Sequence, residues 1–127
     1  MTTELSVLIV EDTPMAQTLC KMVIAKIPHA TSDIAEDGKI ALDKYKVGNY
    51  NLILMDVGLP YLSGIDTTIA IRRYEKENNL APTLIVALTA NKEADVKEKC
   101  LLSGMNDYMT KPFSLEKADY IINKFMR

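Results

Sequence analysis

Apolar residues occur along this chain in two kinds of segment: short continuous runs, and longer stretches in which they recur at helical spacing. The short runs predict five strands, at residues 5–10, 30–35, 52–55, 83–88 and 107–109. The run at 52–55 does not alternate with polar residues, which is typical of a strand buried on both faces of a sheet. The longer stretches predict five helices, at residues 14–27, 40–47, 65–77, 92–103 and 115–126.

Helix-capping and helix-breaking residues stand where one pattern changes to the other. Thr13 can cap the first helix, with Pro14 at the first helical position, where a missing N–H costs nothing. Asn91 and Ser114 are placed to cap the last two helices, and Pro28 ends the first. Three further breakers precede the third helix: Gly58, Pro60 and Gly64.

Strands that alternate with helices in this way imply parallel pairing through right-handed crossovers. We therefore predict that residues 1–127 form a single α/β domain, a doubly wound five-stranded parallel sheet with five helices. In such a sheet, ligands bind at the carboxyl ends of the strands, near the point where the strand order reverses.

Composition and charge narrow the classes of protein that fit. The 15 basic and 17 acidic residues leave a net charge of −2, and the basic residues form no cluster of the kind that nucleic acids or membrane surfaces require. No apolar run approaches the roughly 20 residues that span a bilayer, and the polar first residues, with Glu4, are unlike a signal peptide. Cys20 and Cys100 lack metal-ligand spacing and are predicted to be reduced core residues. We expect a cytoplasmic protein without nucleic-acid or membrane contact.

Polar side chains stand at the carboxyl ends of four of the predicted strands. They are Glu11 and Asp12 after the first strand, Asp56 after the third, Thr89 after the fourth and Lys111 beyond the fifth. Because a parallel sheet brings these ends to one edge, we expect three carboxylates, a hydroxyl and an ammonium to converge there.

Three neighbouring carboxylates repel one another and favour a bound cation. Oxygen ligands alone favour a hard ion, and Mg²⁺ commonly uses a few carboxylates together with waters. We predict that Asp12 and Asp56 bind Mg²⁺ directly and that Glu11 acts through water. The backbone carbonyl of Gly58, two residues after Asp56, is a further candidate ligand.

An ionised aspartate beside Mg²⁺ and a lysine is well placed to attack a phosphorus atom. Asp56 is therefore the predicted phosphoryl acceptor. Lys111 and the Thr89 hydroxyl are predicted to bind the remaining phosphoryl oxygens, and the small side chain of Ala90 leaves room for the group.

The residues around these positions closely resemble the receiver domain of two-component response regulators. The resemblance rests on residues 8–12, 55–60, 88–90 and 111–113, together with Gly64 and Gly104, and it covers essentially the whole chain. It is greatest to receivers attached to hybrid sensor histidine kinases, through residues 88–91 and 104–113. Gly58 departs from the family, in which many members carry a larger side chain at this position, so the lifetime of the phosphorylated form is left open.

The resemblance implies a flavodoxin-like sheet with strand order 2-1-3-4-5 and a cis peptide between Lys111 and Pro112. It implies phosphotransfer to Asp56, in the presence of Mg²⁺, from a histidine kinase or a histidine phosphotransfer protein. Such a domain is not an enzyme beyond catalysing its own phosphorylation and dephosphorylation.

The resemblance also implies a conformational switch. Phosphorylation draws Thr89 toward the phosphate, and Tyr108 on the fifth strand turns inward. The surface of the fourth helix, fifth strand and fifth helix then changes and is bound by an output partner or by a second copy of the domain. The sequence ends just after the last predicted helix, so we expect no output domain in this chain.

Several alternatives stay open at this point. A flavodoxin-like redox protein shares the fold, although Glu11 and Asp12 would repel a flavin phosphate. A phosphatase of the haloacid dehalogenase class also uses an aspartate after a strand, but Gly58 stands where its second aspartate belongs. The chain could instead be a degenerate receiver that binds partners without phosphorylation, or the receiver segment of a hybrid histidine kinase.

Other residues have simpler interpretations. Tyr108 could be ordinary half-buried packing on a short strand, and His29 is predicted to be structural because Pro28 precedes it. The methionines, among them Met15, Met22 and Met55, are predicted to fill the core. Exposed helix faces are predicted for five basic residues: Lys44, Lys46, Arg72, Arg73 and Lys76.

Overall fold

The computed structural model describes residues 4–59, 63–90 and 94–126. Within these residues, strands and helices alternate in the predicted order. The strands are β1 (Leu5–Val10), β2 (Ala30–Ala35), β3 (Leu52–Asp56), β4 (Leu84–Thr89) and β5 (Asp107–Thr110). The helices are α1 (Pro14–Ala25), α2 (Gly38–Val47), α3 (Gly64–Glu77), α4 (Ala94–Ser103) and α5 (Leu115–Phe125).

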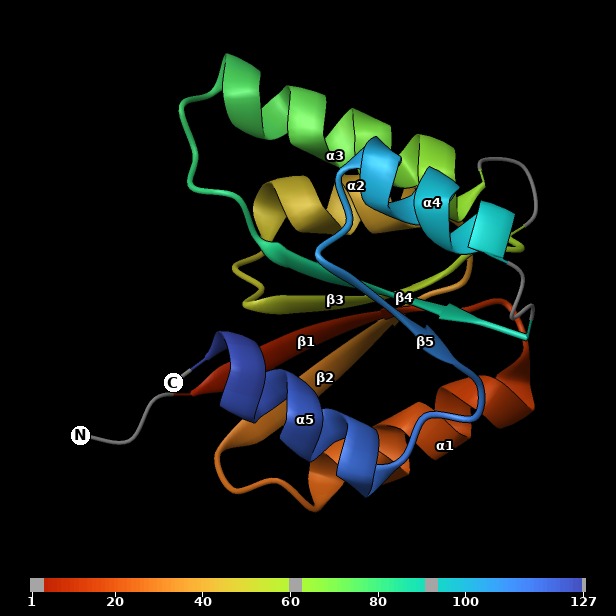
Figure 1. Cartoon of the computed structure of the whole chain (residues 1–127). Helices are drawn as coiled ribbons and strands as arrows, with labels where there is room; N and C mark the ends of the chain where they lie inside the picture. Colours follow the sequence, from red (N-terminus) through yellow and green to blue (C-terminus); the bar gives the residue numbers. More distant parts are fainter. Residues whose placement is uncertain (1–3, 60–62, 91–93, 127) are drawn as a thin grey trace.

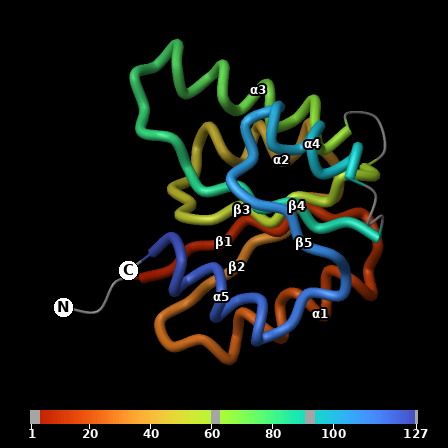
Figure 2. Tube along the Cα trace, viewed as in Figure 1, coloured from red at the N-terminus to blue at the C-terminus, as the bar shows by residue number. Residues whose placement is uncertain are grey.

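The strands form one parallel sheet in the order β2-β1-β3-β4-β5, which confirms the predicted fold class (Figure 1). The strand order reverses at β1, which lies between β2 and β3. Helices α1 and α5 cover one face of the sheet, and α2, α3 and α4 cover the other, so that the molecule has three layers (Figures 1 and 2). No helix in the described part of the chain is long and apolar enough to cross a membrane.

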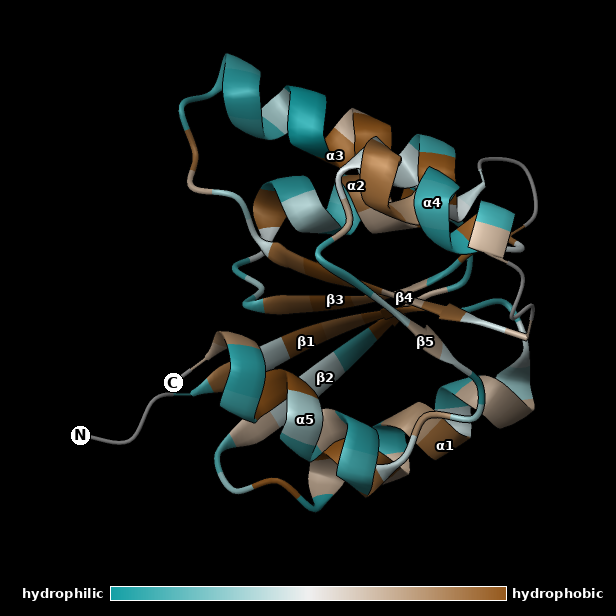
Figure 3. Cartoon of the chain, in the orientation of Figure 1, coloured by the Kyte–Doolittle hydropathy of each residue, from teal (hydrophilic) through white to brown (hydrophobic). Residues whose placement is uncertain are grey.

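Side-chain alternation along the central strands supplies a separate core to each face. In β1, Val7 and Ile9 pack toward α1 and α5, whereas Leu8 and Val10 pack toward the opposite helices. All residues of β3 are buried, as the continuous apolar run predicted. Figure 3 shows apolar central strands between helices in which polar and apolar residues are mixed. Burial of the sheet on both faces fixes its register, because a shift of one residue would exchange the two faces.

Element ends differ from the predictions by one or two residues. Helix α1 ends at Ala25 rather than at residue 27, and β4 runs one residue later than predicted, so that Thr89 is its last residue. Thr13 occupies the N-cap position of α1 but makes no capping hydrogen bond through its side chain. The Ser114 side chain accepts a hydrogen bond from the Lys117 N–H, which confirms that cap. The predicted roles of Pro60 and Asn91 lie outside the described residues.

Two predictions about side-chain burial are wrong in part. Met55 is fully buried, but Met15 and Met22 on α1 are 82% and 58% exposed, so these two do not fill the core. Arg72 is not on an exposed face either, because its side chain is only 20% exposed and is held by several hydrogen bonds. Cys20 and Cys100 are free and buried, as predicted.

Candidate functional site

Three carboxylates meet at the carboxyl edge of the sheet. Glu11 and Asp12 follow the end of β1, and Asp56 ends β3. Val10 pairs with Met55 in the parallel register, so the segments that follow β1 and β3 leave the sheet side by side. One carboxylate oxygen from each acidic residue lies within 4.8 Å of the others. Glu11 and Asp56 are buried, and Asp12 is exposed.

Lys111 enters the acidic cluster from the connection between β5 and α5. Its Nζ lies 2.5 Å from Glu11 Oε1 and 3.4 Å from Asp56 Oδ2. Burial lowers the pKa of Lys111, but the hydrogen bond to Glu11 and the charge of Asp56 act in the opposite direction and prevail, so the pKa lies above its ordinary value. The lysine therefore stays protonated and offsets one of three nearby negative charges. The Lys111–Pro112 peptide is cis, as the resemblance implied.

Backbone groups hold two of the acidic side chains in place. The Gly58 N–H donates to Asp56 Oδ1 at 3.1 Å, and the Thr13 N–H donates to Glu11 Oε2 at 3.1 Å. Gln17 Nε2 donates to the Glu11 carbonyl at 2.7 Å, a contact that the sequence analysis missed. Its position in the first turns of the helix that follows the acidic pair is the signal that could have indicated it.

Gly64 lets the start of α3 pass directly over the end of β3. A Cβ added at Gly64 would lie 2.2 Å from the Asp56 carbonyl oxygen, which no real side chain tolerates. The Gly64 N–H donates to the Val57 carbonyl, which holds the start of α3 next to the end of β3. By contrast, among the described residues outside its immediate chain neighbours, the nearest atom to a Cβ at Gly58 is Asp56 Oδ1, at 4.0 Å.

Thr89 and Tyr108 lie on the two strands beyond Asp56. Leu88 pairs with Asp56, so Thr89, the next residue, stands at the same edge, where it is buried. Tyr108 pairs with Ala87 on β4, is half-buried and packs against the core that faces α2, α3 and α4. The structure thus brings Thr89 to the acidic edge and sets Tyr108 back from it along the neighbouring strand.

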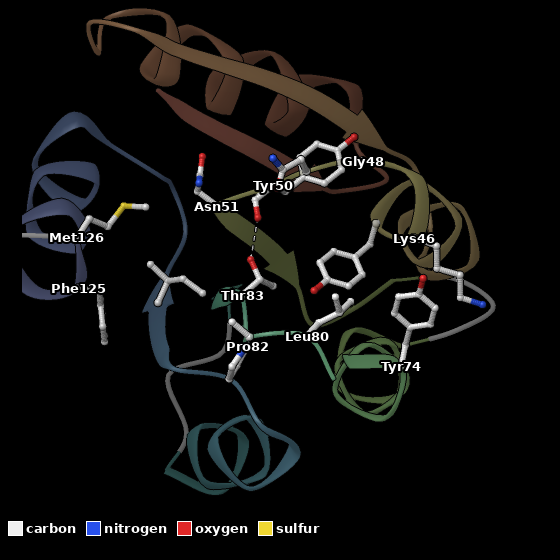
Figure 4. A pocket seen from close by; sticks show the side chains of 14 residues that line it. Lys46, Gly48, Tyr50, Asn51, Tyr74, Leu80, Pro82, Thr83, Phe125 and Met126 are labelled. Carbon is white, nitrogen blue, oxygen red and sulfur yellow. Dashed lines mark hydrogen bonds between the residues drawn. The ribbon is translucent and has the colours of Figure 1, made fainter. Parts of the chain in front are cut away.

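Cavity size does not identify the site in this molecule. A cavity of about 740 Å³ lies at the opposite, amino edge of the sheet, among Tyr50, Tyr74 and Thr83 (Figure 4). In that view the Thr83 hydroxyl donates to the Tyr50 carbonyl. A smaller cavity of about 310 Å³ borders Glu11 and Lys111. The three grouped carboxylates lie at the edge with the smaller cavity.

The donor set at that edge fits a hard divalent cation. All of its ligand atoms are oxygens, two of the carboxylates are buried, and Lys111 offsets only part of their charge. Carboxylates of this kind, with room for waters at an open side, suit Mg²⁺.

A doubly wound sheet with acidic residues after β1, an aspartate ending β3 and a lysine after β5 defines the receiver class of signalling domain. The family model of the response regulator receiver domain matches residues 7–123, and the chain belongs to this family. It is a receiver domain of the two-component phosphorelay class, and the alternatives of a flavin-binding redox protein and of a phosphatase are set aside.

Relatives of this chain include receivers within hybrid kinases. The aerobic respiration control sensor protein ArcB of Escherichia coli is 38% identical over 122 residues, which cover 95% of this chain and 15% of ArcB. The chain spans between 15% and 26% of the length of the first curated relatives that it matches.

Solved structures agree with the fold. The receiver domain of Saccharomyces cerevisiae Ssk1, crystallised with the histidine phosphotransfer protein Ypd1, is 39% identical, with a TM-score of 0.87 over 97% of this chain and 89% of that one. The receiver domain of the Pseudomonas aeruginosa sensor histidine kinase PA1611 is 33% identical, with a TM-score of 0.83 over 98% of each chain. That structure has a magnesium ion coordinated in its active-site cleft.

Proposed function

We propose that Asp56 accepts a phosphoryl group from a phosphohistidine on a histidine kinase or a histidine phosphotransfer protein. The observation that carries the proposal is the buried Asp56 carboxylate, grouped with two other carboxylates and 3.4 Å from the Lys111 ammonium. A carboxylate oxygen of Asp56 attacks phosphorus while the bond from phosphorus to the histidine nitrogen breaks. The imidazole leaves with that electron pair and takes up a proton, and Asp56 becomes an acyl phosphate. The Ypd1 complex of the related Ssk1 receiver supports this class of donor.

Mg²⁺ is the proposed cofactor, held by Asp12, Asp56 and the carbonyl of Gly58, with Glu11 acting through water. When bound, it offsets the negative charge of the carboxylates and of the incoming phosphoryl oxygens. The ion pair between Glu11 and Lys111 supports an indirect role for Glu11, because that carboxylate already has a partner. The magnesium ion in the PA1611 receiver supports the choice of metal.

Lys111 and Thr89 are the proposed ligands of the phosphoryl group after transfer. The Lys111 ammonium lies between Glu11 and Asp56 and can move to a phosphoryl oxygen without leaving the site. Thr89 is the last residue of β4, which pairs with β3, so Thr89 stands at the same edge of the sheet as Asp56. A charge-assisted hydrogen bond from lysine to the acyl phosphate would favour the phosphorylated form.

The proposed readout runs from Thr89 through Tyr108 to the face of α4, β5 and α5. Leu102 on α4 and Tyr120 on α5 are 79% and 49% exposed, which gives this face apolar contacts for an output protein or a second copy. We propose that residues 1–127 act as one cytoplasmic receiver domain, either alone or as the receiver segment of a larger kinase. It turns over no other substrate.

Intact-protein mass spectrometry after incubation with acetyl phosphate tests this function. We expect wild type to gain the mass of one phosphoryl group with Mg²⁺ and none with a chelator. Asp56→Asn should gain nothing, whereas Asp43→Asn, a matched change on the exposed side of α2, should behave as wild type. Absence of labelling in wild type would support the degenerate receiver instead.

A further inference from the structure

A second cluster of charged side chains lies at the amino edge of the sheet, opposite the acidic site. Arg72 and Glu75, one turn apart on α3, form an ion pair at 2.8 Å with side-chain exposures of only 20% and 4%. We call Arg72, Glu75 and Tyr45 the amino-edge cluster. Buried charges persist in proteins when they are paired and hydrogen-bonded, so the partners of this pair show what it holds.

Glu75 joins two elements to α3. Its Oε2 accepts a hydrogen bond from the Tyr45 hydroxyl of α2 at 2.6 Å and one from the Thr83 N–H, just before β4, at 2.8 Å. Its Oε1 accepts from Arg72 Nη1. With both oxygens occupied, Glu75 keeps the Arg72 guanidinium in a fixed orientation.

In that orientation, Arg72 forms hydrogen bonds with the connection between α4 and β5. Its Nε donates to the Gly104 carbonyl at 2.9 Å, and its Nη2 donates to Asn106 Oδ1 at 3.0 Å. Its Nη1 also donates to the Thr83 carbonyl at 2.8 Å. The planar fork of arginine can satisfy all of these acceptors at once, which a lysine ammonium cannot do in the same geometry.

Two residues that Arg72 contacts, Gly104 and Asn106, position the start of β5. Asn106 Oδ1 also accepts from the Ile85 N–H at 2.9 Å, and the Asn106 N–H donates to the Ile85 carbonyl at 2.7 Å, so Asn106 fixes β5 against β4. Gly104 has a φ of +113°, and a Cβ there would lie 2.8 Å from Arg72 Cγ. The backbone between α4 and β5 therefore rests directly on the arginine side chain.

We propose that Arg72 is a positioning residue that anchors the junction of α4 and β5 and makes it the fixed end of the conformational switch. This role rests on the proposed phosphorylation of Asp56. Tyr108 is two residues beyond Asn106, and Thr89 lies at the other end of β4. With the junction held, a change at Thr89 reaches the outer face as a tilt of α4 and a turn of Tyr108, and β5 does not slide along β4.

Amide hydrogen exchange on the whole chain, resolved by peptide, tests the anchor before any phosphorylation. We expect Arg72→Gln to raise exchange in residues 101–108 about tenfold. The matched control is Arg73→Gln, at the exposed neighbouring position, which should leave exchange unchanged. Wild-type exchange in residues 101–108 of Arg72→Gln, or an equal rise in both variants, would overturn the proposal.

Arg72→Lys separates the arginine fork from its charge and keeps the test valid if Arg72→Gln fails to fold. It retains a cation opposite Glu75 but cannot reach Gly104, Asn106 and Thr83 together. We expect fast exchange in residues 101–108 with Asp56 labelled by acetyl phosphate at the wild-type rate. Wild-type protection in Arg72→Lys would show that charge alone suffices and would overturn the proposed anchor.

The exchange response to phosphorylation provides the second readout. In wild type, labelling of Asp56 should change exchange across α4 and β5, and in Arg72→Lys this change should fall at least threefold at equal labelling. An undiminished change would contradict the role of Arg72 in the switch. Failure to label Asp56 in wild type would count against the proposed function alone, because the resting-state exchange does not depend on it.

Discussion

Asp12, Glu11 and Asp56 place three negative charges within 4.8 Å of one another, and Lys111 offsets only part of them. All of these residues could be predicted from the sequence, because each stands at a strand end that a parallel sheet brings to one edge. Their hydrogen bonds could not be predicted, since the position of Lys111 nearer to Glu11 than to Asp56 depends on the path of the β5–α5 connection. The structure brings these residues together, but their chemical roles, and those of Gly58, Thr89 and Tyr108, stay predictions.

Removing one of these charges should stabilise the metal-free protein. We expect Asp12→Asn and Asp56→Asn to raise the thermal midpoint by roughly 2–5 °C, equivalent to about 1 kcal/mol or less, because repulsion among the carboxylates is relieved. Calorimetry in the presence of a chelator measures this, with Asp43→Asn as the control. Lower midpoints for both variants would contradict the repulsion.

At the scale of elements, the order, type and approximate ends of strands and helices follow from apolar periodicity. The periodicity could not predict the amino-edge cluster, because Arg72 lies among charged residues that have the pattern of an exposed helix face. Its burial depends on where α4 ends relative to α3, which is a long-range property. Likewise, the capping side chains of Asp37 and Ser63 could not be told from ordinary loop residues, although each accepts a hydrogen bond from the first turn of its helix.

The close approach of Gly64 to the end of β3 leads to a second prediction at the scale of elements. Gly64→Ala should lower the free energy of unfolding by at least about 2 kcal/mol, because the new methyl group would clash with the backbone of Asp56 and Val57. This clash can be relieved only if the start of α3 moves away from the end of β3. Gly58→Ala, where the nearest atom of the described residues is 4.0 Å from the added Cβ, should change it by less than about 1 kcal/mol. Urea unfolding compares the two. Equal effects would show that the close approach at Gly64 does not limit stability.

At the scale of the whole molecule, the acidic site lies at the carboxyl edge of the sheet, and hydrogen-bonded tyrosines lie toward the amino edge. Burial, together with the hydrogen bond to Asp33 and the charge of that residue, raises the pKa of Tyr50 to about 12. Burial and the hydrogen bond to Glu75 also raise the pKa of Tyr45 above its ordinary value. Both hydroxyls therefore lose their protons at a higher pH in the folded chain than in the unfolded chain.

This difference predicts alkaline sensitivity. A tyrosine in the unfolded chain titrates near pH 10, so the stabilisation from Tyr50 is complete below that value and is lost as the pH rises from about 10 toward 12. We expect the free energy of unfolding to fall over this range, and to fall less steeply in Tyr50→Phe. Denaturant unfolding at several pH values measures it, with Tyr120→Phe on exposed α5 as the control. An equal slope in wild type and Tyr50→Phe would contradict the assignment.

The central claim is that Asp56 carries the phosphoryl group, and chemical mapping of the modified residue tests it most directly. Borohydride reduces an aspartyl phosphate to homoserine, which marks the residue permanently for peptide mass spectrometry. After treatment of wild type with acetyl phosphate and Mg²⁺, we predict homoserine at position 56 and at no other aspartate. Homoserine at Asp12 or elsewhere in place of Asp56, or none at all, would contradict the claim.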